Sequence, residues 1–187
     1  GSEGNGSAVS AHGSGNILLQ TLGSGTNLIA NADITSATGH ITLSAARAVT
    51  FNAGADVITG GVGTIDIAAT TDAITQQDTA RVVSESGDIR LQAQQNIRLS
   101  SVETTANVAV RSMAGSILDN GDTDTDVIAS GALLEATVGV GVLGDDANPL
   151  ETRIGTLAAR ANAGGINLRD DDDLVVDQVM VTTQQIS

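Results

Sequence analysis

Glycines recur at a fixed interval through the first half of the chain, and this periodicity constrains the fold more than any other feature. The recurring glycines stand 24 positions apart: Gly15, Gly39, Gly63 and Gly87. Aliphatic residues follow each of them at the second and fourth positions, as Ile41 and Leu43 follow Gly39. A repeat of this length is typical of a solenoid, in which each repeat is one coil stacked on the next. Apolar residues at positions i and i+2 follow the periodicity of strands, not of helices. The sequence therefore predicts an all-β fold, a parallel β-helix (β-solenoid).

Each coil of about 24 residues is predicted to hold three short strands. The pair Ile-x-Leu marks the first strand, and residues 49–51 exemplify the second. The third strand is marked by residues that are again 24 positions apart: Ile34, Ile58 and Val82. Glycine, Asn, Asp and Ser fill the corners, where positive φ angles or side-chain-capped turns are needed. We expect Ile65 to face inward and Asp66, the next residue, to face outward into solvent.

The repeat also suggests how the chain is organised. We expect residues 15–187 to form a single β-solenoid segment of a longer protein. Residues 1–14 are interpreted as a tag remnant, a flexible tail or a partial coil, because Gly and Ser dominate them. Two acidic insertions, at 121–126 and 170–173, interrupt the repeat in the second half. The end coils of such a fragment expose unpaired strand edges, so end-to-end association is expected.

Composition argues against several classes of function. The formal net charge is −14, which opposes the basic groove that nucleic-acid binding requires. No apolar run is long enough to cross a membrane. The chain has no cysteine, so it offers no disulfide, thiol catalyst or thiolate metal ligand. Phe51 is the only aromatic residue, and all positive charge is carried by arginine.

Two patterns carry a family resemblance. The first is the ladder Gly-x-Ile-x-Leu-x-Ala, seen at 39–45, and the second is a glycine-rich loop at 139–150 ending in Asn-Pro-Leu and followed by Thr-Leu-Ala at 156–158. The chain thereby resembles, over about residues 15–180, the repeat region of filamentous-haemagglutinin-like giant surface adhesins of Gram-negative bacteria. The resemblance implies a right-handed β-helix, a secreted or cell-surface location and an adhesive or spacer role. It implies a host or neighbouring-cell ligand bound by other parts of the parent protein, and it carries over no catalytic or cofactor-binding residues.

The favoured function is therefore a structural rod segment that spaces a binding tip from the cell surface and requires no cofactor. The alternative is a calcium-binding solenoid module whose acidic loops hold Ca²⁺. Its candidate metal ligands are Asp122, Asp124 and Asp126, because alternate side chains of an extended loop point the same way and carboxylates are hard oxygen ligands. The pattern departs from the EF-hand loop, because apolar residues 127–129 follow in place of the later ligands.

A polysaccharide-active β-helix enzyme ranks third, so the chain is predicted not to be an enzyme. Such enzymes use outward carboxylates beside Arg or Lys, and Asp66, Asp88 and Arg90 fall on neighbouring outward positions. The absence of lysine and of aromatic platforms weighs against sugar cleavage. We interpret Asp66 and Arg90 as a solvent-exposed ion pair of little energetic value. On this interpretation Asp66→Asn costs no more than about 0.5 kcal/mol, as for typical surface substitutions.

Overall fold

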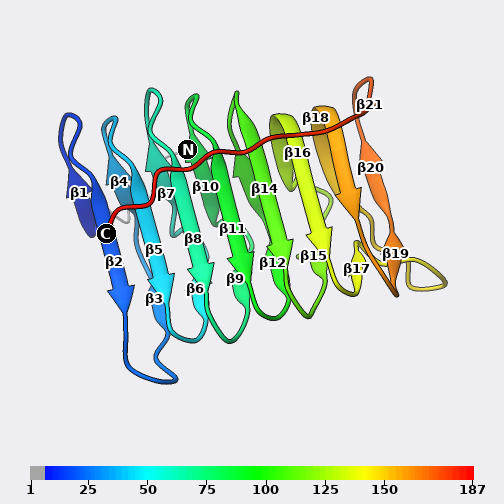
Figure 1. Cartoon of the computed structure of the whole chain (residues 1–187), viewed down its shortest axis with the longest axis horizontal. Helices are drawn as coiled ribbons and strands as arrows, with labels where there is room; N and C mark the ends of the chain where they lie inside the picture. Colours follow the sequence, from blue (N-terminus) through cyan, green and yellow to red (C-terminus); the bar gives the residue numbers. More distant parts are fainter. Residues whose placement is uncertain (1–6) are drawn as a thin grey trace.

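The computed structural model describes residues 7–187 and shows a rod of parallel strands stacked coil upon coil (Figure 1). The coils repeat after about 24 residues and make about seven turns. The secondary structure of the described residues consists of strands without helices. The all-β, parallel β-solenoid fold predicted from the glycine and isoleucine ladders is confirmed.

Three columns of strands run along the rod, and each coil contributes one strand to each column. The first column contains β2 (Ile17–Thr21), β5 (Ile41–Ala45), β8 (Ile65–Ala69), β11 (Ile89–Ala93), β14 (Asn107–Ser112) and β21 (Val175–Val176). The second contains β3 (Leu28–Ala30), β6 (Val49–Phe51), β9 (Ile74–Gln76), β12 (Ile97–Leu99), β15 (Ile117–Asp119), β17 (Gly139–Val140) and β19 (Gly165–Ile166). The third contains β1 (Val9–Ala11), β4 (Ile34–Ser36), β7 (Val57–Thr59), β10 (Arg81–Ser84), β13 (Ser101–Glu103) and β20 (Leu168–Asp170).

Two long strands join the third column to the first. Strands β16 (Val127–Ala136) and β18 (Leu150–Arg160) pass through the corner between these columns without a break. Because β16 pairs with both β13 and β14, the two columns form one 14-stranded sheet facing a separate 7-stranded sheet. The last regular coils therefore have fewer corners than the first ones.

Aliphatic side chains form continuous ladders inside the rod. Ile41, Ile65, Ile89 and Val108 stack in register along β5, β8, β11 and β14, and all four are fully buried. Each buried Ile or Leu side chain contributes about 1.5–3 kcal/mol to folding. The inward position of Ile65 is confirmed, because it lies between Ile41 and Ile89 as the 24-residue step predicts.

The glycine column reflects close approach of stacked backbones. A Cβ atom on Gly63 would collide with the carbonyl oxygen of Gly39, and one on Gly87 would collide with that of Gly63. Buried hydroxyls of the third column satisfy these carbonyls: Thr59 donates to Gly39 at 2.6 Å and Ser84 donates to Gly63 at 2.7 Å. The recurring glycine is therefore the residue that lets neighbouring coils share a hydrogen-bonded corner.

The predicted register of the third strand is wrong by one residue in the second coil. Ile34 pairs with Val57, and Val57 pairs with Val82, so the inward residue there is Val57 and not Ile58. Unequal corner loops shift the spacing, and a shift of one residue turns a strand's side chains to the opposite face. Ile58 consequently lies half-buried on the outer side.

Near the amino terminus, Val9–Ala11 form β1 and pair with β4, so this part of the chain makes a partial coil. Of residues 1–14, which the sequence predicts to be a tag remnant, a flexible tail or a partial coil, residues 1–6 lie outside the described residues.

The C-terminal segment, residues 177–187, leaves the last coil and runs back across the outer face of the first column (Figure 1). Backbone N–H groups of Thr182, Gln184 and Ile186 donate to side-chain oxygens of Asp88, Thr64 and Thr42, at 2.7, 3.0 and 3.0 Å. The side chain of Asn107 donates to the carbonyl of Met180 at 3.1 Å. This crossing segment therefore bonds to four successive coils.

The exposed state predicted for Asp66 is wrong because this segment covers it. Asp66 points outward, but its side chain is only 1% exposed. The Arg90 guanidinium donates to both carboxylate oxygens of Asp66, at 3.0 and 2.7 Å, and the Thr183 hydroxyl bonds to Oδ2 at 3.1 Å. The predicted ion pair exists, but it is a covered pair and not a solvent-exposed one.

Candidate metal centre

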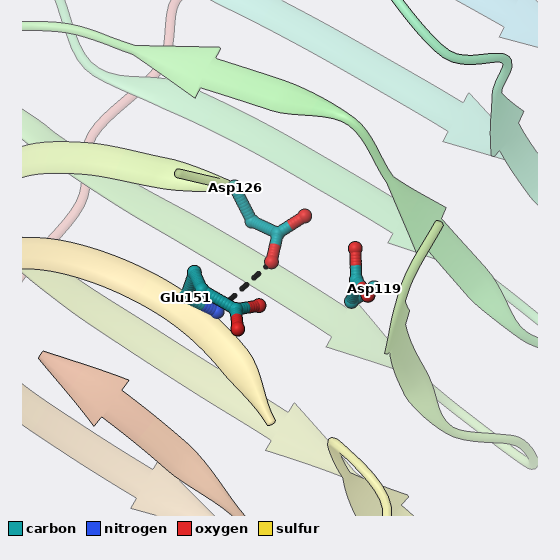
Figure 2. A group of neighbouring side chains, drawn as sticks. All are labelled: Asp119, Asp126 and Glu151. Carbon is teal, nitrogen blue, oxygen red and sulfur yellow. Dashed lines mark hydrogen bonds between the residues drawn. The ribbon is translucent and has the colours of Figure 1, made fainter. Parts of the chain in front are cut away.

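Three acidic side chains converge inside the fifth and sixth coils (Figure 2). They are Asp119, Asp126 and Glu151, and we call them the acidic triad. Carboxylate oxygens of the three lie within 4.8 Å of one another. Asp119 is 1% exposed, Asp126 is fully buried and Glu151 is 8% exposed. The acidic triad is thus enclosed by protein, unlike an ordinary acidic surface cluster.

Asp119 is the last residue of β15 and faces inward because side chains alternate along the strand. Ile117 and Asp119 are buried, while Leu118 between them is half-buried on the outer side. The residue paired with Asp119 in the preceding coil is Leu99, a fully buried apolar residue. A carboxylate therefore occupies a position in the core ladder that the previous coil fills with leucine.

Asp126 stands directly before β16, at a corner where other coils also carry aspartate. Asp33 and Asp56 precede β4 and β7, and each accepts a backbone N–H of the next coil, at 3.0 and 2.9 Å. Asp126 does the same through Oδ2, which accepts the Glu151 N–H at 3.0 Å (Figure 2). This corner aspartate is thus a cap for the axial stacking of coils. Asp33 and Asp56 stay half-buried, whereas Asp126 is buried.

Each member of the acidic triad has one buried oxygen without a hydrogen-bond partner among the described residues. These atoms are Oδ1 of Asp119, Oδ1 of Asp126 and Oε2 of Glu151. The second oxygen of Asp119 accepts the Gly121 N–H at 2.8 Å. The ion pairs found within residues 7–187 involve other side chains. Buried carboxylates normally have their charge paired or hydrogen-bonded, so this arrangement is costly unless something compensates it.

The enclosure changes the acidity of the site. Burial, followed by the neighbouring charge of Asp119, raises the pKa of Asp126 from 3.8 to about 9. Burial likewise raises the pKa of Glu151, with Asp119 adding to the effect and Arg169 opposing it. Without a cation the site therefore holds a proton at neutral pH, because three carboxylates at this spacing cannot all stay ionised in the interior.

The insertion between β15 and β16 contains the three predicted metal ligands, but only the last of them lies in the acidic triad. Asp126 belongs to the acidic triad. Asp122 is half-buried and its Oδ1 accepts the Asp124 N–H at 2.8 Å, while Asp124 is exposed. Burial raises the pKa of Asp122 as well. Of the three predicted ligands the structure brings only Asp126 to the enclosed group.

The acidic residues of the second insertion and of the outward pair are hydrogen-bonded or exposed to solvent. Asp170 accepts the hydroxyl of Thr152 at 2.6 Å and the N–H of Ile154 at 3.1 Å, so it caps the corner between two coils. The three aspartates that follow it, at 171–173, are exposed. The covered pair Asp66–Arg90 lies beneath residues 182–184, where its charged atoms bind one another and the crossing segment.

Comparison with known proteins adds no assignment. No protein-family model, curated protein or solved structure matches the chain. Within residues 7–187 no helix has the length and apolar character needed to cross a membrane. The interpretation of function therefore depends on the fold, on the resemblance described above and on the acidic triad.

Proposed function

We propose that the chain is a structural rod segment of a large secreted bacterial adhesin, located at the cell surface, where it spaces a binding tip from the cell. The observation that carries this proposal is the continuity of the ladders, because inward aliphatic residues and parallel backbone pairing extend without a break from β2 to β18. Hydrogen bonds between parallel strands run along the rod axis, so the coils resist bending and extension together. The resemblance to filamentous-haemagglutinin-like repeats supports the same function.

In this proposal the rod has no catalytic role and needs no cofactor for its spacing function. The outward pair Asp66–Arg90, which the enzyme hypothesis would use, is bonded internally and lies under Thr183. The ligand on a host or neighbouring cell is bound by other parts of the parent protein. The net charge of −14 keeps such a repetitive surface soluble and discourages lateral association.

A competition experiment tests the proposal. The purified chain is added in excess to cells or surfaces to which the parent protein adheres. A spacer is expected to leave adhesion unchanged, because it contains no ligand-binding site. Loss of adhesion in the presence of the chain would assign a ligand-binding surface to the rod itself and refute the spacer function.

Length provides the second part of this test. Removing residues 39–86 from the parent deletes two whole coils and joins Thr38 to Gly87, which keeps the glycine column in phase. The reach of the rod should then fall by about 10 Å, two strand spacings, while adhesion is retained. Removing residues 39–74 ends within a coil, breaks the ladder register and is the matched control that should abolish folding.

A calcium-binding module is the second candidate function, and one specific observation favours it. The acidic triad presents three buried, unpartnered carboxylate oxygens close together, which is the ligand chemistry that hard divalent cations prefer. The favoured position lies inside the coils and not in the exposed part of the insertion.

A further inference from the structure

We propose that Asp119, Asp126 and Glu151 form a binding site for a divalent cation of the Ca²⁺ type, placed between the fifth and sixth coils. This ligand set shares only Asp126 with the set that the sequence pattern indicates, and it places the second candidate function inside the coils. The proposed site is independent of the rod proposal, because a spacer with or without a cation remains a spacer.

The unpartnered oxygens are the first argument. Asp119 and Asp126 are at least nine-tenths buried, and each directs an oxygen into the group without a hydrogen bond from any described residue. Figure 2 shows the three carboxylates turned toward a common centre. A cation at that centre would receive one oxygen from each side chain and compensate their charge, which hydrogen bonds within the protein do not.

The spacing is the second argument. Ca²⁺ binds oxygens at about 2.4 Å, so two ligands on opposite sides of the ion lie about 4.8 Å apart and all other pairs lie closer. The ligand atoms of the acidic triad lie within 4.8 Å of one another. The group contains neither histidine nor cysteine, which Zn²⁺ prefers. Mg²⁺ demands ideal octahedral geometry and gives up its waters reluctantly, so an enclosed site suits Ca²⁺ better.

The position in the fold gives the ion a structural task. The segment that links β15 to β16, residues 120–126, begins next to Asp119 and ends with Asp126, so both of its ends meet at the acidic triad. Glu151 comes from β18 in the next coil. A cation held by all three would close the base of the insertion and tie it to the neighbouring coil. Calcium binding is therefore expected to stabilise this junction of the rod.

The alternative is that the group is compensated by shared protons alone. Such a group would be neutralised without any metal, and added calcium would act only by screening the net charge. Screening affects all variants alike and is reproduced by magnesium at the same ionic strength. A specific site stabilises the folded chain in proportion to ligand occupancy and depends on individual ligands.

The experiment uses the full chain, freed of metal with a chelator and then dialysed. Calcium is titrated by calorimetry, and the melting temperature is measured by far-ultraviolet circular dichroism in calcium or magnesium at constant ionic strength. We expect one saturable calcium site per chain and a rise in melting temperature beyond the magnesium control. In Asp126→Asn both should be lost, while the amide oxygen still accepts the Glu151 N–H that Asp126 now accepts.

Two variants of the same loop are the matched controls. Asp124→Asn removes one exposed charge outside the acidic triad and should leave calcium binding intact. The double variant Asp122→Asn, Asp124→Asn tests the exposed part of the insertion, and binding that survives it supports the enclosed site. Circular dichroism of each metal-free variant verifies that the rod is folded.

Two results would overturn the inference. One is the absence of saturable calcium binding, together with a melting temperature no higher in calcium than in magnesium. The other is calcium binding that persists in Asp126→Asn but disappears in the double variant, because this places the ion on the exposed insertion. Neither result bears on the spacer function, which the competition experiment tests separately.

Discussion

The metal-free chain should lose stability as pH rises through neutrality, and Asp126 is the main reason. Its pKa is 3.8 in the unfolded chain and about 9 in the folded one. Between these values the folded protein binds one more proton at Asp126 than the unfolded protein does. The free energy of unfolding therefore falls by about 1.4 kcal/mol for each unit of pH increase, and this fall ends once the pH passes the folded-state pKa.

From pH 6 to pH 8 this single group removes about 3 kcal/mol of stability, twice the change per unit. Burial also raises the pKa values of Glu151 and Asp122, so protonation of either group likewise favours the folded chain, whereas Arg169 opposes the shift at Glu151. Asp119 also lies close to Asp126, and because it is unchanged in an Asp126→Asn variant, it is present in both chains when they are compared. A change of this size is a large fraction of the stability of an ordinary domain.

Asp126→Asn isolates the contribution, because the amide mimics the protonated carboxyl and does not titrate. The variant should lose most of the pH dependence between pH 6 and pH 8. It should also be more stable than the unmodified chain at pH 8, although a buried hydrogen-bonding residue has been replaced. Asp124→Asn, at an exposed position, should follow the unmodified chain at every pH.

The assay is urea unfolding in a calcium chelator, followed by the β-sheet signal in circular dichroism. Tryptophan and tyrosine are absent, so intrinsic fluorescence offers no substitute. Parallel slopes of unfolding free energy against pH for the unmodified chain and Asp126→Asn would refute the assignment of a proton to Asp126. The two histidines are present in all variants and cancel in this comparison.

The remaining predictions concern the ladders, the covered face and the ends of the rod. Ile65→Asp should destabilise the chain by about 3–5 kcal/mol through an unpaired buried charge, and equal melting of this variant and the unmodified chain would disprove the inward assignment. Asp66→Asn should cost about 1.5–3 kcal/mol, because it weakens charged hydrogen bonds to Arg90. Deletion of residues 178–187 should reduce the destabilisation caused by Asp66→Asn to about 0.5 kcal/mol, since the carboxylate then faces water. The same destabilisation in the full and the shortened chain, measured by urea unfolding, would show that the segment does not cover Asp66 in solution. Concentration-dependent sedimentation should reveal end-to-end association, and a concentration-independent monomer would contradict it.

The sequence predicted the coils well because the strongest signal was also the physically dominant one. Ile41, Ile65 and Ile89 occupy equivalent places at a constant step, and their burial is what stacks the coils. The constant spacing of 24 residues no longer holds where the corner loops of neighbouring coils differ in length. The 24-residue spacing aligns Ile58 with Ile34 and Val82, but Val57 occupies that position in the structure.

The sequence predicts one member of the acidic triad and misses the other two. Asp119 lies two residues after Ile117 and is therefore an inward position by strand alternation alone. The alternating aspartates of the adjoining insertion instead predict Asp122, Asp124 and Asp126 as ligands, of which only Asp126 belongs to the acidic triad. Glu151 offered no comparable signal, because its nearness to Asp126 depends on pairing across coils whose loops are unequal.

The covered outer face could not be foreseen from periodicity at all. The residues that bury Asp66 lie more than a hundred positions away, in a segment that does not follow the repeat. Bonds from the backbone of residues 182–186 to side chains of earlier coils depend on a path that no local pattern specifies.

A small structural change separates an ordinary corner of this rod from the proposed cation site. Aspartate before the third strand is an axial cap in other coils too, and Asp33 and Asp56 perform this role while partly open to water. At Asp126 the same cap is enclosed, and Asp119 and Glu151 place two further carboxylates beside it. Enclosure removes the water that stabilises charge, so the arrangement must acquire a proton or a cation to remain folded. In other coils this cap only accepts a backbone N–H of the next coil. In the fifth coil, the stability of the folded rod therefore depends on the proton or cation that the cap binds.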